Sequence, residues 1–194
     1  MDFLAAKDYI IRKLREELPS SLTYHGLHHT LDVSRSAKEI ARMESIGGED
    51  ILLLETAALY HDSGFTRTYQ NHEAAGCDIA RESLPLFGYN KIQIRKICGM
   101  IMATRIPQSP TNLLEQILCD ADLYYLGRSD FYHIGDTLFK EFLYQGIVKD
   151  ERDWNQLQVK FLSNHNYFTS TAIHMRKANK DKHLREVKEL VRTA

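Results

Sequence analysis

The chain has 194 residues, of which 43% are hydrophobic and 26% are charged, a composition typical of a folded globular domain. Its 25 basic and 26 acidic residues give a formal net charge of −1, so no global positive field favours nucleic acid or anionic lipid. A chain of this length can bury a large core, and we expect one domain over residues 1–194.

The N-terminal segment and the cysteines both favour a cytoplasmic protein. Residues 1–18 carry acidic and basic side chains throughout, so we expect neither a signal peptide nor a membrane span. Cys77, Cys98 and Cys119 form no metal-type pair and lie in apolar helical patterns, which predicts buried free thiols. Free thiols are typical of a reducing compartment.

Helical periodicity runs through nearly the whole chain, and no segment alternates like a β-strand. The first predicted helix carries an apolar stripe and ends at Pro19-Ser20, where proline stops it. The second extends over about 22–46 and ends at Gly47-Gly48, since glycine readily takes the left-handed cap conformation. The third, 49–61, is apolar on every side, so we expect it in the middle of the protein.

Six further helices are predicted in the rest of the chain. Proline and glycine residues separate them, and Ser129 and Thr169 are expected N-caps. Their expected ranges are 71–84, 91–103, 112–125, 130–144, 150–165 and 169–191. The pattern predicts an all-α, single-domain helical bundle.

Three segments place ionisable side chains in apolar helical surroundings. His25 and His29 lie in YHGLHH at the start of the second predicted helix, four residues apart and so on one face. His61-Asp62 ends the all-apolar helix, and Asp122 closes the run ILCDAD. Burying such groups is costly unless they are paired or coordinate a metal. Imidazole with carboxylate suits Mn²⁺, Fe²⁺, Zn²⁺, Co²⁺ or Ni²⁺.

The order His, His-Asp, Asp resembles the HD superfamily of metal-dependent phosphohydrolases. The resemblance covers about the first two-thirds of the chain, through YHGLHHTLDV, AALYHDSGF and CDADLYYLG. It implies that one divalent ion is held by His29, His61, Asp62 and Asp122, with Asp120 the weaker candidate for the final position. It also implies an HD-type fold with a metal-site core at about 22–126 and helices of 129–194 packing on it.

The resemblance also suggests catalytic roles. A divalent ion lowers the pKa of bound water toward about 7 and neutralises phosphate oxygens, so that the water can attack phosphorus. In the family the HD aspartate commonly orients this water, which gives Asp62 two roles. The YHG-x-x-H segment is similar to YHN-x-x-H in cyclic nucleotide phosphodiesterases, where the first histidine protonates the leaving oxygen. His25 is therefore a candidate acid, or else a histidine that only orients its neighbours.

A second cluster follows in NHEAAG, residues 71–76. HD proteins with two metals often use a histidine here and another at the end of the next helix, where this chain has Thr104. That departure disfavours a second metal at His72, so His72 and Glu73 are expected to bind substrate or a metal-linked water. For Glu73, stabilisation of the helix start is the alternative. Arg105 is a candidate for binding phosphate, although arginines at helix ends are commonly just exposed.

These patterns lead to the hypothesis of a phosphohydrolase that acts on a nucleotide or another small phosphorylated metabolite. It would use one divalent ion, whose identity the sequence leaves open and which could also be Mg²⁺. One alternative is an HD-type di-iron oxygenase, which Thr104 disfavours. The other is a non-catalytic metal-binding interaction module, which the complete ligand set disfavours. The segment HDSGFT lacks the acids of HD-x-x-E-D alarmone hydrolases, so that substrate is disfavoured.

The C-terminal third is rich in aromatic residues at helical spacing. This spacing favours core or dimer packing over base stacking, so a homodimer is one expected partner. No stable nucleic-acid partner and no membrane association are expected.

Overall fold

The computed structural model describes residues 1–193, which contain nine α-helices, three short 3-10 helices and no strand. The predicted all-α bundle is therefore confirmed. The α-helices are α1 (Phe3–Glu17), α2 (Leu27–Met43), α3 (Gly48–Tyr60), α4 (His72–Ser83), α5 (Lys91–Ala103), α6 (Leu113–Asp122), α7 (Phe131–Tyr144), α8 (Glu151–Asn164) and α9 (Ser170–Thr193). The 3-10 helices are η1 (Ser63–Thr66), η2 (Leu84–Phe87) and η3 (Tyr124–Gly127).

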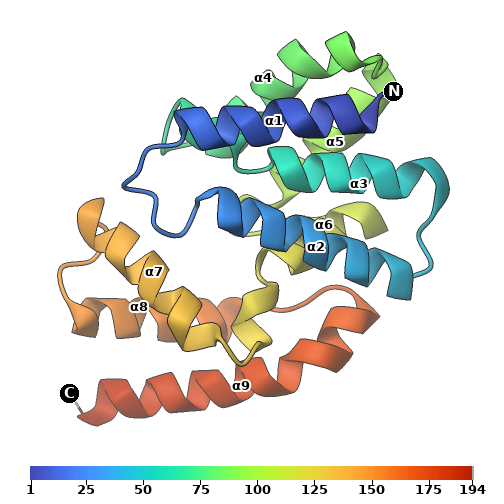
Figure 1. The fold of residues 1–194 in the computed structure, drawn as a ribbon. Coiled ribbons are helices and arrows are strands. Elements are labelled where there is room, and N and C mark those ends of the chain that lie inside the picture. Colours follow the sequence, from blue (N-terminus) through green and yellow to red (C-terminus); the bar gives the residue numbers. More distant parts are fainter. Residues whose placement is uncertain (194) are drawn as a thin grey trace.

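Helix α3 lies in the middle of the bundle, as the apolar residues on all of its sides predict. Every residue from Leu53 to Tyr60 is buried, and the helix packs against α1, α2, α5 and α6. Figure 1 shows α1, α4 and α5 on one side of α2 and α3, with α7, α8 and α9 on the other. None of the helices in residues 1–193 combines the length and apolar character that crossing a bilayer requires.

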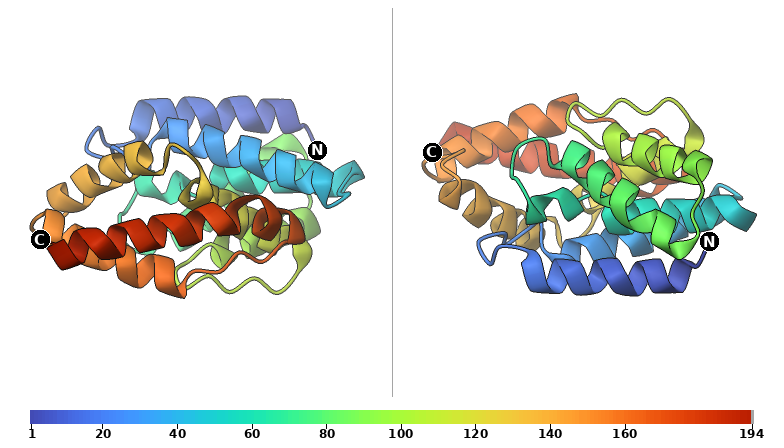
Figure 2. Two further views of the ribbon diagram at one scale, coloured as in Figure 1. Left: turned by 90° about the horizontal axis from the view of Figure 1, so that it is seen from below. Right: turned by 90° about the horizontal axis from the view of Figure 1, so that it is seen from above.

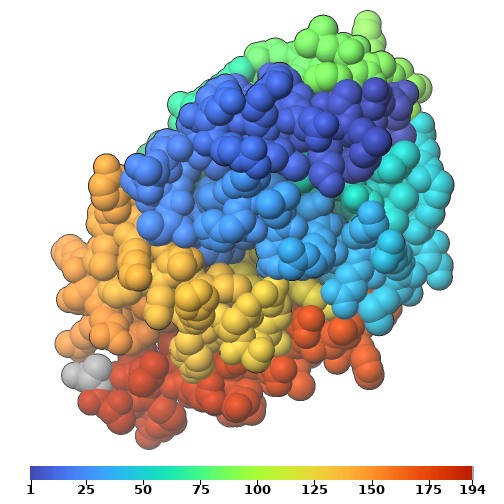
Figure 3. Space-filling view, viewed as in Figure 1, coloured from blue at the N-terminus to red at the C-terminus, as the bar shows by residue number. Residues whose placement is uncertain are grey.

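The C-terminal helices build a second apolar cluster beside the main core. Helix α9 packs on α8 and η3, and α7 also contacts η3. The two views of Figure 2 show α8 and α9 side by side, and Figure 3 shows the surface of the later segments adjoining that of α2. Tyr24 from the loop before α2 joins this cluster, together with Leu123, Tyr125, Leu126, Phe131, Leu162 and Val187.

The structure corrects two local predictions and confirms two. Helix α2 begins at Leu27, about five residues later than predicted, because Gly26 takes an extended conformation and serves as N-cap. Ser129 is not the N-cap of α7; that position is Asp130, whose side chain makes no capping hydrogen bond. The Thr169 hydroxyl does accept from the Ala172 amide at the start of α9, as predicted. The three cysteines are buried and free.

Candidate metal centre and adjoining cavity

Three helix ends bring the predicted ligands together. His29 lies in the first turn of α2, His61 and Asp62 directly follow α3, and Asp122 is the last residue of α6. Helix α2 packs against both α3 and α6, which explains why these ends converge. All four residues are buried or nearly so.

The ligand atoms alternate around a closed ring, imidazole beside carboxylate. His29 Nε2 lies 3.1 Å from Asp122 Oδ1 and 3.5 Å from Asp62 Oδ2. His61 Nε2 lies 3.5 Å from that Asp122 oxygen and 3.2 Å from that Asp62 oxygen. Two ligands about 2.1 Å from one ion, roughly 90–110° apart, are separated by about 3.0–3.4 Å. The ligand atoms of His29, His61 and Asp122 all lie within 4.8 Å of one another, close enough for one small divalent ion, and Asp62 Oδ2 completes the ring beside the two histidines.

His61 gives a sharper test of this fit. Its Nδ1 lies 2.8 Å from the Ala58 carbonyl oxygen, which can only accept, so Nδ1 carries a proton. In the neutral imidazole, Nε2 then presents a lone pair toward Asp62 Oδ2. Both atoms are buried, and neither has a hydrogen-bond partner among the residues described. Two facing lone-pair atoms in this position need a cation between them, or a second proton on His61.

The electrostatics of the ring point the same way. Burial opposes ionisation of Asp62 and Asp122, but the neighbouring imidazoles hold the pKa of each carboxyl below its usual value. Burial alone would lower the pKa of His61, but the charges of the two carboxylates raise it well above its ordinary value. The carboxylates thus attract positive charge to this point, and a divalent ion would displace the proton from His61.

His25 has a buried carboxylate partner that sequence reasoning missed. Its Nδ1 lies 2.5 Å from Glu141 Oε1, and Glu141 Oε2 accepts from the backbone amides of Tyr24 and His25 at 2.9 and 3.1 Å. Glu141 lies on α7 and is fully buried. Burial lowers the pKa of His25, but the hydrogen bond to Glu141 and the surrounding carboxylates raise it overall. The His25 and His29 ring centroids are 5.9 Å apart, so both face one site although α2 begins after His25.

His72 faces the oxygen of Asp62 that lies outside the ring. Its Nε2 is 3.5 Å from Asp62 Oδ1 and 3.6 Å from Glu73 Oε1. The imidazole stacks on Phe65, with ring centroids 3.9 Å apart. Gly64 allows η1 and α4 to approach this closely, because a Cβ there would lie 1.8 Å from the His72 carbonyl oxygen.

The remaining predicted residues lie farther from the ring. Thr104 lines the cavity described below, and its hydroxyl donates to the Ile101 carbonyl oxygen. The Arg105 guanidinium donates to Asn71 Oδ1 at 3.1 Å and does not line that cavity, so its binding of phosphate stays a prediction. Asp120 points away and accepts from the Thr169 amide and hydroxyl at 2.8 and 2.7 Å, so it anchors the start of α9.

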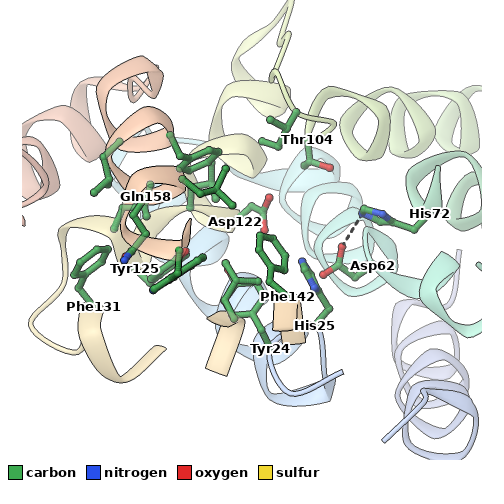
Figure 4. A pocket seen from close by; sticks show the side chains of 18 of the residues that line it. Tyr24, His25, Asp62, His72, Thr104, Asp122, Tyr125, Phe131, Phe142 and Gln158 are labelled. Carbon is green, nitrogen blue, oxygen red and sulfur yellow. Dashed lines mark ion pairs between the residues drawn. The ribbon is translucent and has the colours of Figure 1, made fainter. Parts of the chain in front are cut away.

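A cavity of about 310 Å³ extends from this centre toward the C-terminal helices. Figure 4 shows His25, Asp62 and His72 at one end and Phe131 with Gln158 at the other, with Asp122 between them. The aromatic stretch was expected to form core or dimer packing; Phe131 does belong to the second apolar cluster, and part of the stretch also lines this cavity. The residues concerned are Phe131, Phe142, Trp154 and Phe161.

The fold and the site together define a class of helical domain, a bundle that brings His, His-Asp and Asp together from three helix ends. A model of the HD domain matches residues 26–125, just over half of the chain. The chain belongs to the HD domain family. The match includes all four residues of the ring and ends near the boundary that we predict between a core at 22–126 and helices of 129–194.

A relative and three solved structures are similar to the chain. An uncharacterized protein of Clostridium beijerinckii is 34% identical over 104 residues, which are 52% of this chain and 66% of that protein. The chain thus aligns with slightly less than two-thirds of that relative's length.

The solved structures share the fold at lower identity. A predicted HD superfamily hydrolase from an uncultured Thermotogales bacterium has a TM-score of 0.62 and 23% identity, covering 96% of this chain and 90% of that one. A Lactobacillus plantarum protein has a TM-score of 0.68 and 17% identity, covering 100% and 98%. Bacillus subtilis YpgQ in complex with ADP has a TM-score of 0.66 and 19% identity, covering 100% and 97%.

Proposed function

We propose that the protein is a metal-dependent phosphohydrolase that cleaves a phosphate ester or anhydride of a nucleotide or another small phosphorylated metabolite. One divalent ion would be held by His29, His61, Asp62 and Asp122. The observation that carries the proposal is the facing pair His61 Nε2 and Asp62 Oδ2, buried 3.2 Å apart and without hydrogen-bond partners in residues 1–193. Membership of the HD family supports the reaction class, and the ADP bound to the similarly folded YpgQ supports a nucleotide.

When bound, a divalent ion supplies a water of lowered pKa and neutralises charge on phosphate oxygens. Asp62 is suited to orient that water because its two carboxylate oxygens point in different directions. Oδ2 belongs to the ligand ring, whereas Oδ1 faces His72 Nε2 at 3.5 Å. His72 and Glu73 line the cavity beside it and would position the substrate.

His25 would give its proton to the leaving oxygen. Glu141 accepts from Nδ1, fixes the orientation of the ring and stabilises the charged imidazolium, so Nε2 is left to face the cavity. The two backbone amides that donate to Glu141 hold this carboxylate ionised, since they and His25 lower its pKa against the effect of burial. His25 and Glu141 therefore form an acid and its positioning residue.

Replacing Glu141 with glutamine should lower the pKa of His25, because a neutral amide no longer stabilises the imidazolium. An acid works in its protonated form, so activity falls as pH rises through the pKa of His25. The basic limb of the kcat profile should therefore move to lower pH in Glu141→Gln, and kcat at pH 8 should fall about 10²-fold. A pH profile of kcat measures this, with the exposed Glu189→Gln as control. Superimposable wild-type and Glu141→Gln profiles would remove His25 from the acid role.

A hydrolysis screen tests the function itself. Nucleotides and simple phosphate esters are offered with Mn²⁺, Co²⁺, Ni²⁺, Zn²⁺ and Mg²⁺, beside the His61→Ala variant prepared in the same way. We expect phosphate release by the wild-type protein with at least one metal and none by His61→Ala. Release that survives in His61→Ala comes from a contaminant. A wild-type protein that is inactive with every metal contradicts the proposal, and two irons per chain with oxygen consumption would favour an oxygenase.

A further inference from the structure

We propose that the substrate carries a single phosphate and a flat, largely apolar organic group, and that this group occupies an aromatic chamber at the far end of the cavity. The chamber is formed by Phe131, Phe142, Trp154, Leu157, Gln158 and Phe161, from α7 and α8. The inference rests on the proposed function and narrows its substrate class.

The chamber is continuous with the candidate metal centre. One cavity is lined both by Asp62 and Asp122 of the ligand ring and by the aromatic residues of the chamber. A phosphate held at the ring would therefore direct its organic group between α7 and α8 (Figure 4). The volume of about 310 Å³ lies near the lower end of the range for small-molecule sites, which is about 300–1,000 Å³.

The charges along the cavity favour one phosphate. Of the lining residues in the described chain, none is lysine or arginine. The ionisable groups that line it near the ring include three carboxylates, Asp62, Glu73 and Asp122, beside His25 and His72. A second or third phosphate would add negative charge to this end with no fixed cation to pair it.

The arginines beside this cavity are engaged elsewhere, and Lys160 lines a second cavity that shares Leu157 and Phe161 with it. Arg105 donates to Asn71 outside the cavity. Arg128 lines a different cavity, where its guanidinium donates to Asp32 and, through two nitrogens, to Asp130. Neither arginine lines the cavity along which a phosphate chain would extend into the aromatic chamber.

The chamber wall is suited to a planar group. Trp154 is held between two rings: its centroid lies 5.8 Å from that of Phe139, nearly parallel, and 5.9 Å from that of Phe142, perpendicular. Such packing fixes the indole so that a flat ligand can stack without ordering it. Gln158 lies one turn further along α8, and its Nε2 donates to Asn155 Oδ1. Its carbonyl oxygen remains to accept one hydrogen bond from the ligand.

The fluorescence of Trp154 can report ligand binding in the chamber, because Trp154 is the sole tryptophan of the chain. The probes are phenylphosphonate and methylphosphonate, which share a head group that is not hydrolysed and differ in the organic group alone. With Mg²⁺ present, phenylphosphonate should change the tryptophan emission and bind about tenfold or more tightly than methylphosphonate, as burial of a ring predicts. Equal affinities, or an unchanged emission at saturation, would overturn the inference.

A variant of the chamber separates this site from the metal centre. Leu157 lines the chamber and is only partly buried, so Leu157→Phe should fold while filling part of the space. It should weaken phenylphosphonate about tenfold and leave methylphosphonate unchanged. Leu157→Ala, which enlarges the chamber, should keep both ligands. If Leu157→Phe weakens neither ligand or both equally in calorimetric titrations, the organic group does not occupy the chamber.

Turnover distinguishes failure of the inference from failure of the proposed function. Wild-type kcat/KM should be higher for phenyl phosphate than for glycerol 2-phosphate or ATP. A protein that hydrolyses ATP or glycerol 2-phosphate best is a phosphohydrolase without this specificity, and the inference alone fails. A protein that hydrolyses no nucleotide and no phosphate ester of the screen with any metal removes the function on which the inference depends.

Discussion

Replacing Asp62 with asparagine is expected to lower kcat by about 10³-fold or more. Asparagine preserves the shape of the side chain but removes the negative charge that faces His29 and His61 at 3.5 and 3.2 Å. It also replaces an oxygen that can take a proton from water by an amide that cannot. Steady-state kinetics with saturating metal measure the loss, and circular dichroism checks that the helical bundle persists.

Asp78→Asn is the matched control for this substitution. Asp78 is exposed on α4 and pairs with Arg81, away from the ligand ring. We expect its kcat to equal that of the wild-type protein. Full activity in Asp62→Asn would exclude Asp62 from both of its proposed roles.

Metal binding should stabilise the fold strongly and in a pH-dependent way. At a free metal concentration one hundred times Kd, the free energy of unfolding should rise by about 2.7 kcal/mol. For a chain of this size that corresponds to a rise in Tm of about 5–10 °C. Thermal unfolding with Mg²⁺ or Mn²⁺ and with a chelator measures the difference.

The sign of the pH effect follows from His61. Its pKa is raised in the metal-free fold, so its protonated form stabilises that fold below the unfolded pKa, and this stabilisation is lost as pH rises through the folded pKa. Protons also compete with metal for the imidazole nitrogen. The metal-dependent rise in Tm should therefore be larger at pH 8 than at pH 6, and it should vanish in His61→Ala. A rise of equal size in His61→Ala would locate the stabilising ion elsewhere.

Local patterns predicted most of the helices because their causes are local. Helix α5 occupies Lys91–Ala103, as predicted, and Asn90 with Gln93 forms a capping box at its start. Helix α3 is apolar on all sides and buried where the sequence predicts it. The predicted start of α2 was wrong, because apolar periodicity alone does not reveal that Gly26 is the N-cap and that the helix begins only after it.

The candidate site was only partly predictable. His29, His61, Asp62 and Asp122 could be grouped because their order along the chain resembles that of a family, not because spacing alone brings them together. Glu141 carried no such signal: it lies 116 residues from His25 on an amphipathic helix, and only the packing of the C-terminal helices places it there.

The aromatic chamber also could not be predicted from the sequence alone. Helical spacing of Phe131, Phe142 and Trp154 fits a core and a cavity wall equally well, because both need apolar side chains on one helix face. The difference depends on how closely α7 and α8 approach each other and η3, which is decided by contacts distant in sequence. Phe131 and Trp154 are buried as core packing predicts, and only the structure reveals that they also line a cavity.

Anomalous diffraction from crystals grown with Mn²⁺, recorded above and below the manganese edge, would locate the divalent ion. We expect one strong anomalous peak inside the ring of His29 Nε2, His61 Nε2, Asp62 Oδ2 and Asp122 Oδ1, about 2.0–2.3 Å from each atom. A peak bound only at His72 and Glu73, or an ordered ring with no peak at saturating Mn²⁺, would contradict this expectation.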